Sequence, residues 1–331
     1  MNTTAAFTAP PILSNAHVQS VLTSAPLRRW LIKRRVRAYQ QASCKEIIAL
    51  PDCKLTRLLA VRTRSEQARG LVIMLHGWEG SADSTYMLAL GDALWRSGFT
   101  TVRLNFRDHG DSHYLNPELF HSCRLDEVVA AIRQIASDSK LPAYLTGFSL
   151  GGNFALRTAC RAGDFSNPLQ HVFAISPVII PKHVLHELEH GLPVYEHYFL
   201  RKWRKSLGKK QDLYPELYGD SNWDQAKGIY AMTRILVERY TEFDSIDDYL
   251  AGYAIHDDYL LQLEAPATII TAADDPIIPV ADFSSLPEHE LLQLEIHRHG
   301  GHCGFISNWQ MHSWLEQTLA QRINQQIKDH A

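Results

Sequence analysis

Long apolar runs are missing from this sequence, and so is any cysteine pattern typical of a disulfide scaffold or a zinc site. No apolar stretch approaches the roughly 20 residues that a membrane-spanning helix needs. The five cysteines are odd in number, scattered and without C-x-x-C spacing, which favours a reducing compartment. Residues 1–19 lack a charged stretch followed by an apolar one, so a signal peptide is not expected. We therefore expect a cytoplasmic protein.

A large excess of charge of either sign is also missing. The formal net charge is −3 and the isoelectric point is near 6.6, which argues against a dedicated binder of nucleic acid or another polyanion. Internal repeats and low-complexity tracts are absent as well. With 331 residues, 45% of them hydrophobic, the chain can bury a sizeable core in one large α/β domain or two small ones.

The most informative stretch that is present is Gly147-Phe148-Ser149-Leu150-Gly151, which has the G-x-S-x-G form of a nucleophile elbow. An apolar strand pattern precedes it and an apolar-periodic helix follows it, which is the context that this motif requires. The sharp turn strains the backbone at Ser149, so only small residues fit two positions to either side. The pattern favours a serine nucleophile above the start of a helix over an ordinary surface turn.

A serine nucleophile needs a base, and the base needs a carboxylate, in the chain order Ser, Asp or Glu, His. Position selects His302 from seventeen histidines, because it follows the last predicted strand in a glycine-flanked loop; the alternative is a structural loop histidine. Asp274 and Asp275 both follow the preceding strand. We favour Asp275, which is followed by three residues and a proline, and interpret Asp274 as a turn former or a supporting hydrogen-bond partner. Cys303 could be a second nucleophile, but a packing role is favoured.

Two backbone N–H groups are predicted to form an oxyanion hole. One is that of Leu150, directly after the nucleophile, and the other is that of Trp78, in the loop after the third predicted strand. His76 in the same loop has no partner at ligand spacing, so a metal is not expected.

Eight strand patterns, with helices between most of the later ones, predict a mostly parallel sheet with helices on both faces. The predicted strands are 45–50, 55–62, 70–75, 99–105, 143–146, 172–176, 267–272 and 291–297, and the predicted helices include 84–96, 125–137 and 307–327. Residues 1–26 are predicted to be an ordered arm. The basic and apolar residues 27–37 could form a helix that lies on anionic lipid, although a solvated basic face is favoured for so short a run.

The alternation of strands and helices breaks between residues 177 and 263, which we predict to be a helical insertion covering the site. Tyr195, Phe199 and Trp203 cluster there at helical spacing. They are candidates for an apolar acyl pocket, and the alternative is that they form the insertion's own core.

Together these motifs resemble those of the α/β-hydrolase superfamily, and within it AB hydrolase family 4, the group of YheT-type esterases and their eukaryotic ABHD relatives. Asn15-Ala16-His17-Val18-Gln19-Ser20 resembles the N-x-H-h-Q-[ST] signature of that branch, where h is apolar. His76-Gly77-Trp78-Glu79-Gly80-Ser81 resembles its H-G-h-x-G-S loop. Asn105-Phe106-Arg107-Asp108-His109-Gly110 resembles its N-x-R-G-x-G loop, with Asp108 in place of the usual glycine.

The resemblance implies an α/β-hydrolase fold with a triad of Ser149, Asp275 and His302, a helical cap, and hydrolysis of carboxylic esters without a cofactor. We expect one hydrolase domain over residues 1–331, with the cap inserted at 177–263, and a small-molecule acyl ester as substrate. A thioesterase or amidase with the same triad is one alternative. A non-catalytic binding protein on a hydrolase fold is another, although binding alone would not need all three residues.

Overall fold

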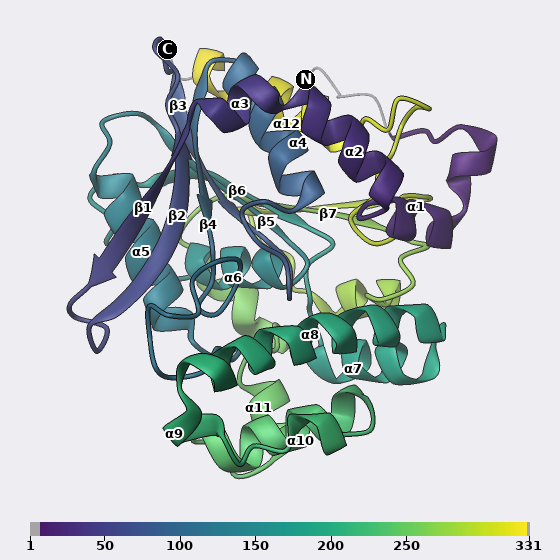
Figure 1. Cartoon of the computed structure of the whole chain (residues 1–331). Helices are drawn as coiled ribbons and strands as arrows, with labels where there is room; N and C mark the ends of the chain where they lie inside the picture. Colours follow the sequence, from purple (N-terminus) through teal and green to yellow (C-terminus); the bar gives the residue numbers. More distant parts are fainter. Residues whose placement is uncertain (1–6, 330–331) are drawn as a thin grey trace.

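The computed structural model describes residues 7–329, and its eight strands form one sheet in the order β1-β2-β4-β3-β5-β6-β7-β8 (Figure 1). The strand β2 is antiparallel to both of its neighbours, and all the other pairs are parallel. The mostly parallel sheet predicted from the sequence is confirmed. The strands are β1 (Ser43–Leu50), β2 (Thr56–Thr63), β3 (Gly70–Leu75), β4 (Phe99–Leu104), β5 (Ala143–Phe148), β6 (Leu169–Ile175), β7 (Ala267–Ala272) and β8 (Leu292–His297).

Helices cover both faces of this sheet, which is why its central strands are continuous apolar runs. Every residue of β3, β4, β5 and β7 is buried, whereas no residue of the edge strand β8 is. The helices α5 (Leu125–Ser137) and α6 (Leu150–Ala159) pack together on one face. On the other face α4 (Thr85–Arg96) contacts both α12 (Trp314–Asp329) and α2 (Pro26–Arg35) (Figure 1). The remaining elements outside the β6–β7 connection are η1 (Pro11–Ser14), α1 (Ala16–Leu22), α3 (Arg37–Gln41) and η4 (Val280–Ser285).

Several predicted boundaries need correction, including the start of β6, which lies at Leu169 instead of residue 172. The last helix begins at Trp314 instead of near residue 307, because Ile306 and Ser313 form an isolated β-bridge and Met311 has a φ of +63°. The strand β5 continues to Phe148 instead of ending at residue 146. The predicted arm, residues 1–26, is helical over η1 and α1, and its first six residues lie outside the described part of the chain.

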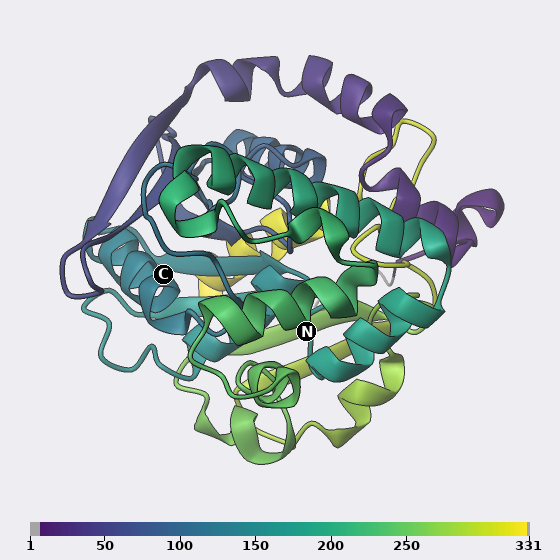
Figure 2. The same cartoon turned by 60° about the horizontal axis from the view of Figure 1, so that its bottom comes forward.

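The connection between β6 and β7 is helical, and Figure 2 shows its helices lying across the ends of the strands. Three of them begin with proline, whose fixed φ suits the first turn of a helix. The elements are α7 (Pro181–His190), α8 (Pro193–Leu213), α9 (Pro215–Tyr218), η2 (Trp223–Gln225), α10 (Gly228–Tyr240), α11 (Ile246–Ala251) and η3 (Asp257–Gln262). We call these the β6–β7 helices. None of the helices described between residues 7 and 329 is long and apolar enough to span a membrane.

A buried ion pair joins α8 to the loop after β4. Lys210 is fully buried, and its Nζ donates to Asp108 Oδ1 at 2.6 Å and to the carbonyl oxygen of Asn116 at 2.5 Å. Burial raises the pKa of Asp108 to about 6 and lowers the pKa of Lys210, so desolvation opposes both charges. Asp108 also has a φ of +58°, a conformation that glycine adopts without strain. Asp108, which stands in place of the usual glycine in the motif Asn105–Gly110, is therefore the ion-pair partner of Lys210 in α8.

We expect Lys210→Met to lower the free energy of unfolding by about 3–5 kcal/mol, because the Asp108 carboxylate is left buried without its cation. Adding Asp108→Gly removes that charge and relieves the backbone, so the double variant should recover most of the loss. Chemical denaturation of the wild type, both single variants and the double variant measures this coupling. A double variant no more stable than Lys210→Met would contradict the prediction.

Candidate active site

Ser149 lies at the turn between β5 and α6, in the geometry expected of a nucleophile elbow. Its φ of +54° and ψ of −117° fall in a region that non-glycine residues rarely occupy. A Cβ on Gly147 would lie 2.0 Å from the carbonyl oxygen of Gly151, and a Cβ on Gly151 would lie 2.5 Å from that of His76. Both glycines are required because backbone passes directly against them, which leaves the Ser149 hydroxyl at the carboxyl end of β5.

The structure brings Ser149, His302 and Asp275 into one hydrogen-bonded chain, although they are far apart in the sequence. His302 Nε2 lies 3.0 Å from Ser149 Oγ, and His302 Nδ1 lies 2.9 Å from Asp275 Oδ2. When the neutral imidazole carries its proton on Nδ1, it donates to Asp275 and accepts from the serine hydroxyl. This arrangement prepares Nε2 to take the serine proton.

The two neighbouring aspartates after β7 have separate contacts. Asp275 turns one carboxylate oxygen to His302, and its Oδ1 accepts from the N–H groups of Ile277 and Ile278 at 2.9 and 3.0 Å. Asp274 points elsewhere, since its Oδ1 accepts from the Gly301 N–H at 2.9 Å. Asp274 therefore supports the loop that carries His302 but does not contact the imidazole of that residue.

Two opposed effects act on the His302 imidazole. Burial lowers its pKa, but the Asp275 carboxylate and, to a lesser degree, the Cys303 sulfur raise it, and the pKa ends well above the ordinary value of 6.5. Cys303 Sγ lies 3.8 Å from His302 Nε2, farther than Ser149 Oγ. Since only the neutral imidazole accepts a proton, any reaction in which His302 acts as a base should become faster as the pH rises through this raised pKa.

The backbone N–H groups of Trp78 and Leu150 lie on the two segments that meet at Ser149. A Cβ on Gly77 would lie 3.2 Å from Ser149 Cβ, so the loop after β3 passes directly against the serine. Within residues 7–329, neither N–H has an acceptor in the protein. Leu150 is also the first residue of α6, where the helix dipole adds partial positive charge.

His76 and Tyr86 hold the loop after β3 in place. The buried His76 imidazole contacts the carbonyl oxygen of Gly77 through Nδ1 at 2.8 Å and accepts from the Phe106 N–H through Nε2 at 3.2 Å. Burial lowers the pKa of His76 well below its ordinary value, so it stays neutral. The Tyr86 hydroxyl accepts from the Gly77 N–H at 2.9 Å. Sequence reasoning missed Tyr86, because nothing in the spacing from Gly77 marks it as a partner.

The three aromatic residues of α8 selected from the sequence have different surroundings. Phe199 is half-buried and stacks on the Trp78 ring, with centroids 5.3 Å apart. Trp203 is buried and meets the Trp78 ring edge-on at 5.1 Å. Tyr195 is buried, and its hydroxyl lies 2.9 Å from His17 Nδ1 in α1. Phe199 and Trp203 therefore contact the side chain of Trp78, a predicted oxyanion residue, whereas Tyr195 contacts α1.

The described residues include no group of three or more His, Cys, Asp or Glu side chains arranged to hold a metal ion. All five cysteines, which lie within the described residues, are free thiols.

The chain is similar to known proteins in sequence and in fold. The family model of the alpha/beta hydrolase fold matches residues 70–308. The chain is 27% identical over 327 residues to an Escherichia coli (strain K12) protein named "Putative esterase YheT", covering 92% of this chain and 89% of that protein. It is 23% identical over 272 residues to a Dictyostelium discoideum "Abhydrolase domain-containing protein", covering 78% and 67%. It shares the fold of an esterase from Pyrococcus furiosus, with a TM-score of 0.55, 15% identity, and coverage of 87% of this chain and 90% of that one.

We expect Asp275→Asn to lower the pKa of the His302 imidazole to its ordinary value or below, because burial then acts without the opposing carboxylate. The matched variant Asp274→Asn should keep the raised pKa. Titration of the imidazole signals by NMR measures both. The opposite result, with the pKa lost only in Asp274→Asn, would exchange the roles of the two residues.

Proposed function

The chain belongs to the alpha/beta hydrolase fold family, and we propose that it is a serine esterase that cleaves carboxylic acyl esters through an acyl-enzyme intermediate. The observation that carries this proposal is the hydrogen-bonded chain from Ser149 through His302 to Asp275. A hydrolase fold and esterase-named relatives support the general activity. The proposed location is the cytoplasm, with free thiols in a reducing compartment.

In the proposed reaction Ser149 Oγ attacks the acyl carbonyl carbon while His302 Nε2 takes the hydroxyl proton. The tetrahedral intermediate collapses, the bond to the alcohol oxygen breaks, and His302 gives its proton to the departing alcohol. Water then attacks the acyl-enzyme with His302 again as the base, which releases the carboxylic acid and restores Ser149. Asp275 keeps the imidazole in the tautomer that this sequence of proton transfers needs.

Negative charge on the carbonyl oxygen would be stabilised by the Trp78 and Leu150 N–H groups. Their lack of protein acceptors leaves both available to a substrate oxygen. Removing one donor of this kind typically lowers kcat by a factor of about 10²–10³, so the Trp78 N–H in the loop after β3 would contribute to kcat by a similar factor.

The β6–β7 helices are the proposed cap, within a single hydrolase domain over residues 1–331 and with the cap at 177–263. Their position across the strand ends supports this assignment (Figure 2). A cap at this place would select the acyl chain, while the groups around Ser149 would set the rate of the chemical step.

We expect Ser149→Ala to fold normally and to lose esterase activity by about 10³-fold or more. Labelling of the wild type with a fluorophosphonate, followed by peptide mapping, should place the label on Ser149 and not on Cys303. A matched control is Ser43→Ala, which removes a hydroxyl on the edge strand β1, separated from β5 by three strands. Wild-type turnover of a p-nitrophenyl acyl ester by Ser149→Ala would refute the proposal, and matched thioester and amide substrates would identify a different preferred bond.

Substitution of Phe199 and of Trp203 should have different effects because their burial differs. Phe199→Ala should change the kcat/KM ratio between decanoyl and acetyl esters by roughly tenfold, since each accommodated methylene is worth about 1–3 kcal/mol. Trp203→Ala and Tyr195→Ala should mainly destabilise the fold. For Trp203→Ala we expect the free energy of unfolding to fall by about 3–5 kcal/mol. If Phe199→Ala leaves the chain-length preference unchanged, the acyl pocket is elsewhere.

A further inference from the structure

The N-terminal helix α1 lies against the loop that carries His302. Ser20 Oγ accepts a hydrogen bond from the His302 N–H at 2.8 Å and donates one to the carbonyl oxygen of Ala16 at 2.7 Å. The hydroxyl therefore joins the backbone of the proposed base to the backbone of α1. It is a hydrogen bond from a distant segment to His302 itself.

Gln19 holds the other end of the same loop. Its side chain is fully buried, and its amide pairs with both backbone groups of Ile306. Oε1 accepts from the Ile306 N–H at 2.7 Å, and Nε2 donates to the Ile306 carbonyl oxygen at 3.0 Å and to that of Leu13 at 2.5 Å. Since residues 302 and 306 are both bonded to α1, the loop cannot shift without breaking these hydrogen bonds.

The loop depends on these contacts because its own backbone is strained. Cys303 and Phe305 have φ values of +58° and +48°, which L-residues rarely adopt. The approach of α1 is so close that a Cβ on Gly301 would lie 2.4 Å from the carbonyl oxygen of Ala16, and one on Gly304 would lie 2.8 Å from that of Gln19. Gly301 and Gly304 thus leave the space in which α1 packs against the loop.

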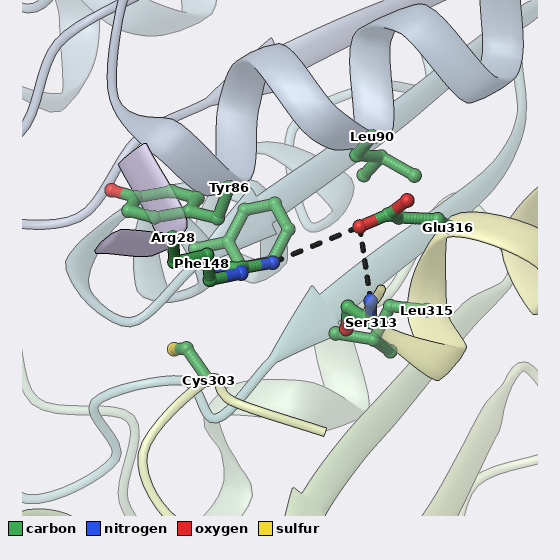
Figure 3. Close-up of a pocket in the computed structure, with 8 residues that line it drawn as sticks. All are labelled: Arg28, Tyr86, Leu90, Phe148, Cys303, Ser313, Leu315 and Glu316. Carbon is green, nitrogen blue, oxygen red and sulfur yellow. Dashed lines mark hydrogen bonds and ion pairs between the residues drawn. The ribbon is translucent and has the colours of Figure 1, made fainter. Parts of the chain in front are cut away.

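A second buried side chain from the N-terminal segment, Arg28 of α2, binds the chain just after this loop. Its Nε donates to the carbonyl oxygen of Met311 at 3.1 Å, and its Nη2 lies 3.7 Å from Glu316 Oε1. Figure 3 shows Glu316 between Arg28 and the Ser313 backbone. Glu316 Oε1 accepts a hydrogen bond from the Ser313 N–H at 3.0 Å. The cavity that these residues line is only about 10 Å³, so this region is packed and holds no ligand site.

We propose that Gln19 and Ser20 are positioning residues for His302, and that the Asn15–Ser20 motif serves to hold the imidazole within reach of Ser149. The motif's other polar residues fit this purpose. Asn15 caps α1 by accepting from the N–H groups of His17 and Val18, and His17 Nδ1 reaches the Tyr195 hydroxyl of α8 at 2.9 Å. The motif therefore contacts both the loop of His302 and the proposed cap.

The inference rests on the proposed function for its catalytic consequence but not for its geometry. Without the Ser20 hydroxyl, the His302 N–H loses its acceptor and the loop can relax. The imidazole would then be displaced from Ser149 and Asp275. Small displacements of a reacting group lower kcat strongly and leave substrate binding nearly unchanged.

The test compares Ser20→Ala with Ser20→Thr, which keeps the hydroxyl, and with the control Thr23→Val. Among residues 7–329, the Thr23 hydroxyl donates to the carbonyl oxygen of Gln19 within the arm and to no other group, so its removal weakens the same segment without touching the loop of His302. The melting temperature of each protein is measured first. The kcat and KM for a p-nitrophenyl ester and the NMR titration of His302 are then measured at a temperature at which all variants are folded.

We expect kcat of Ser20→Ala to fall by about tenfold or more with KM within about twofold, and the pKa of His302 to move down towards its ordinary value. Ser20→Thr should restore both, and Thr23→Val should keep both. Wild-type kcat and titration in Ser20→Ala, or equal losses in Thr23→Val, would overturn the inference. A wild type that hydrolyses no ester and takes no fluorophosphonate would instead refute the proposed function, and the titration alone would then decide whether Ser20 positions His302.

Discussion

The strained backbone at Ser149 is the constraint on which the rest of the site depends. A residue with positive φ between a buried strand and a helix must be surrounded closely, because only dense packing keeps it there. Gly147 and Gly151 allow that packing, and Gly77 lets the loop after β3 approach the serine. The same closeness brings together the two segments that carry Trp78 and Leu150. The turn therefore determines the position of the Ser149 hydroxyl and the path of the loop after β3 beside it.

Parallel strands explain how distant residues meet at this turn. The carboxyl ends of β3, β5 and β7 lie along one edge of the sheet, so the loops that follow them converge there, although more than a hundred residues separate β5 from β7. The loop of His302 follows β8 at the end of the sheet and has to cross to Ser149. That loop contains two strained non-glycine residues and lies against the N-terminal helix.

Buried polar side chains join the segments that the sheet itself does not hold. Gln19 and Arg28 bind the chain around and beyond the His302 loop, and Lys210 binds Asp108 across the interface between α8 and the loop after β4. The buried charges of Arg28 and Lys210 contribute little net stability because desolvation opposes them, but losing one partner of such a charge is strongly unfavourable. They therefore determine how these segments are arranged more than they stabilise the fold.

The sequence by itself determined the strands, the elbow at Ser149 and the glycine-flanked loop of His302, because each is marked by a residue pattern within a few positions of the chain. It left Asp274 and Asp275 as alternatives, since adjacent carboxylates in one loop differ only in the direction that the fold gives them. It also placed the start of α12 too early, because apolar periodicity does not reveal the bridge between Ile306 and Ser313. Only the tertiary structure paired Asp108 with Lys210 and set Gln19 and Ser20 against the loop of His302. These contacts join residues that are about a hundred or more positions apart, and no local pattern specifies which buried polar groups will meet once the segments pack.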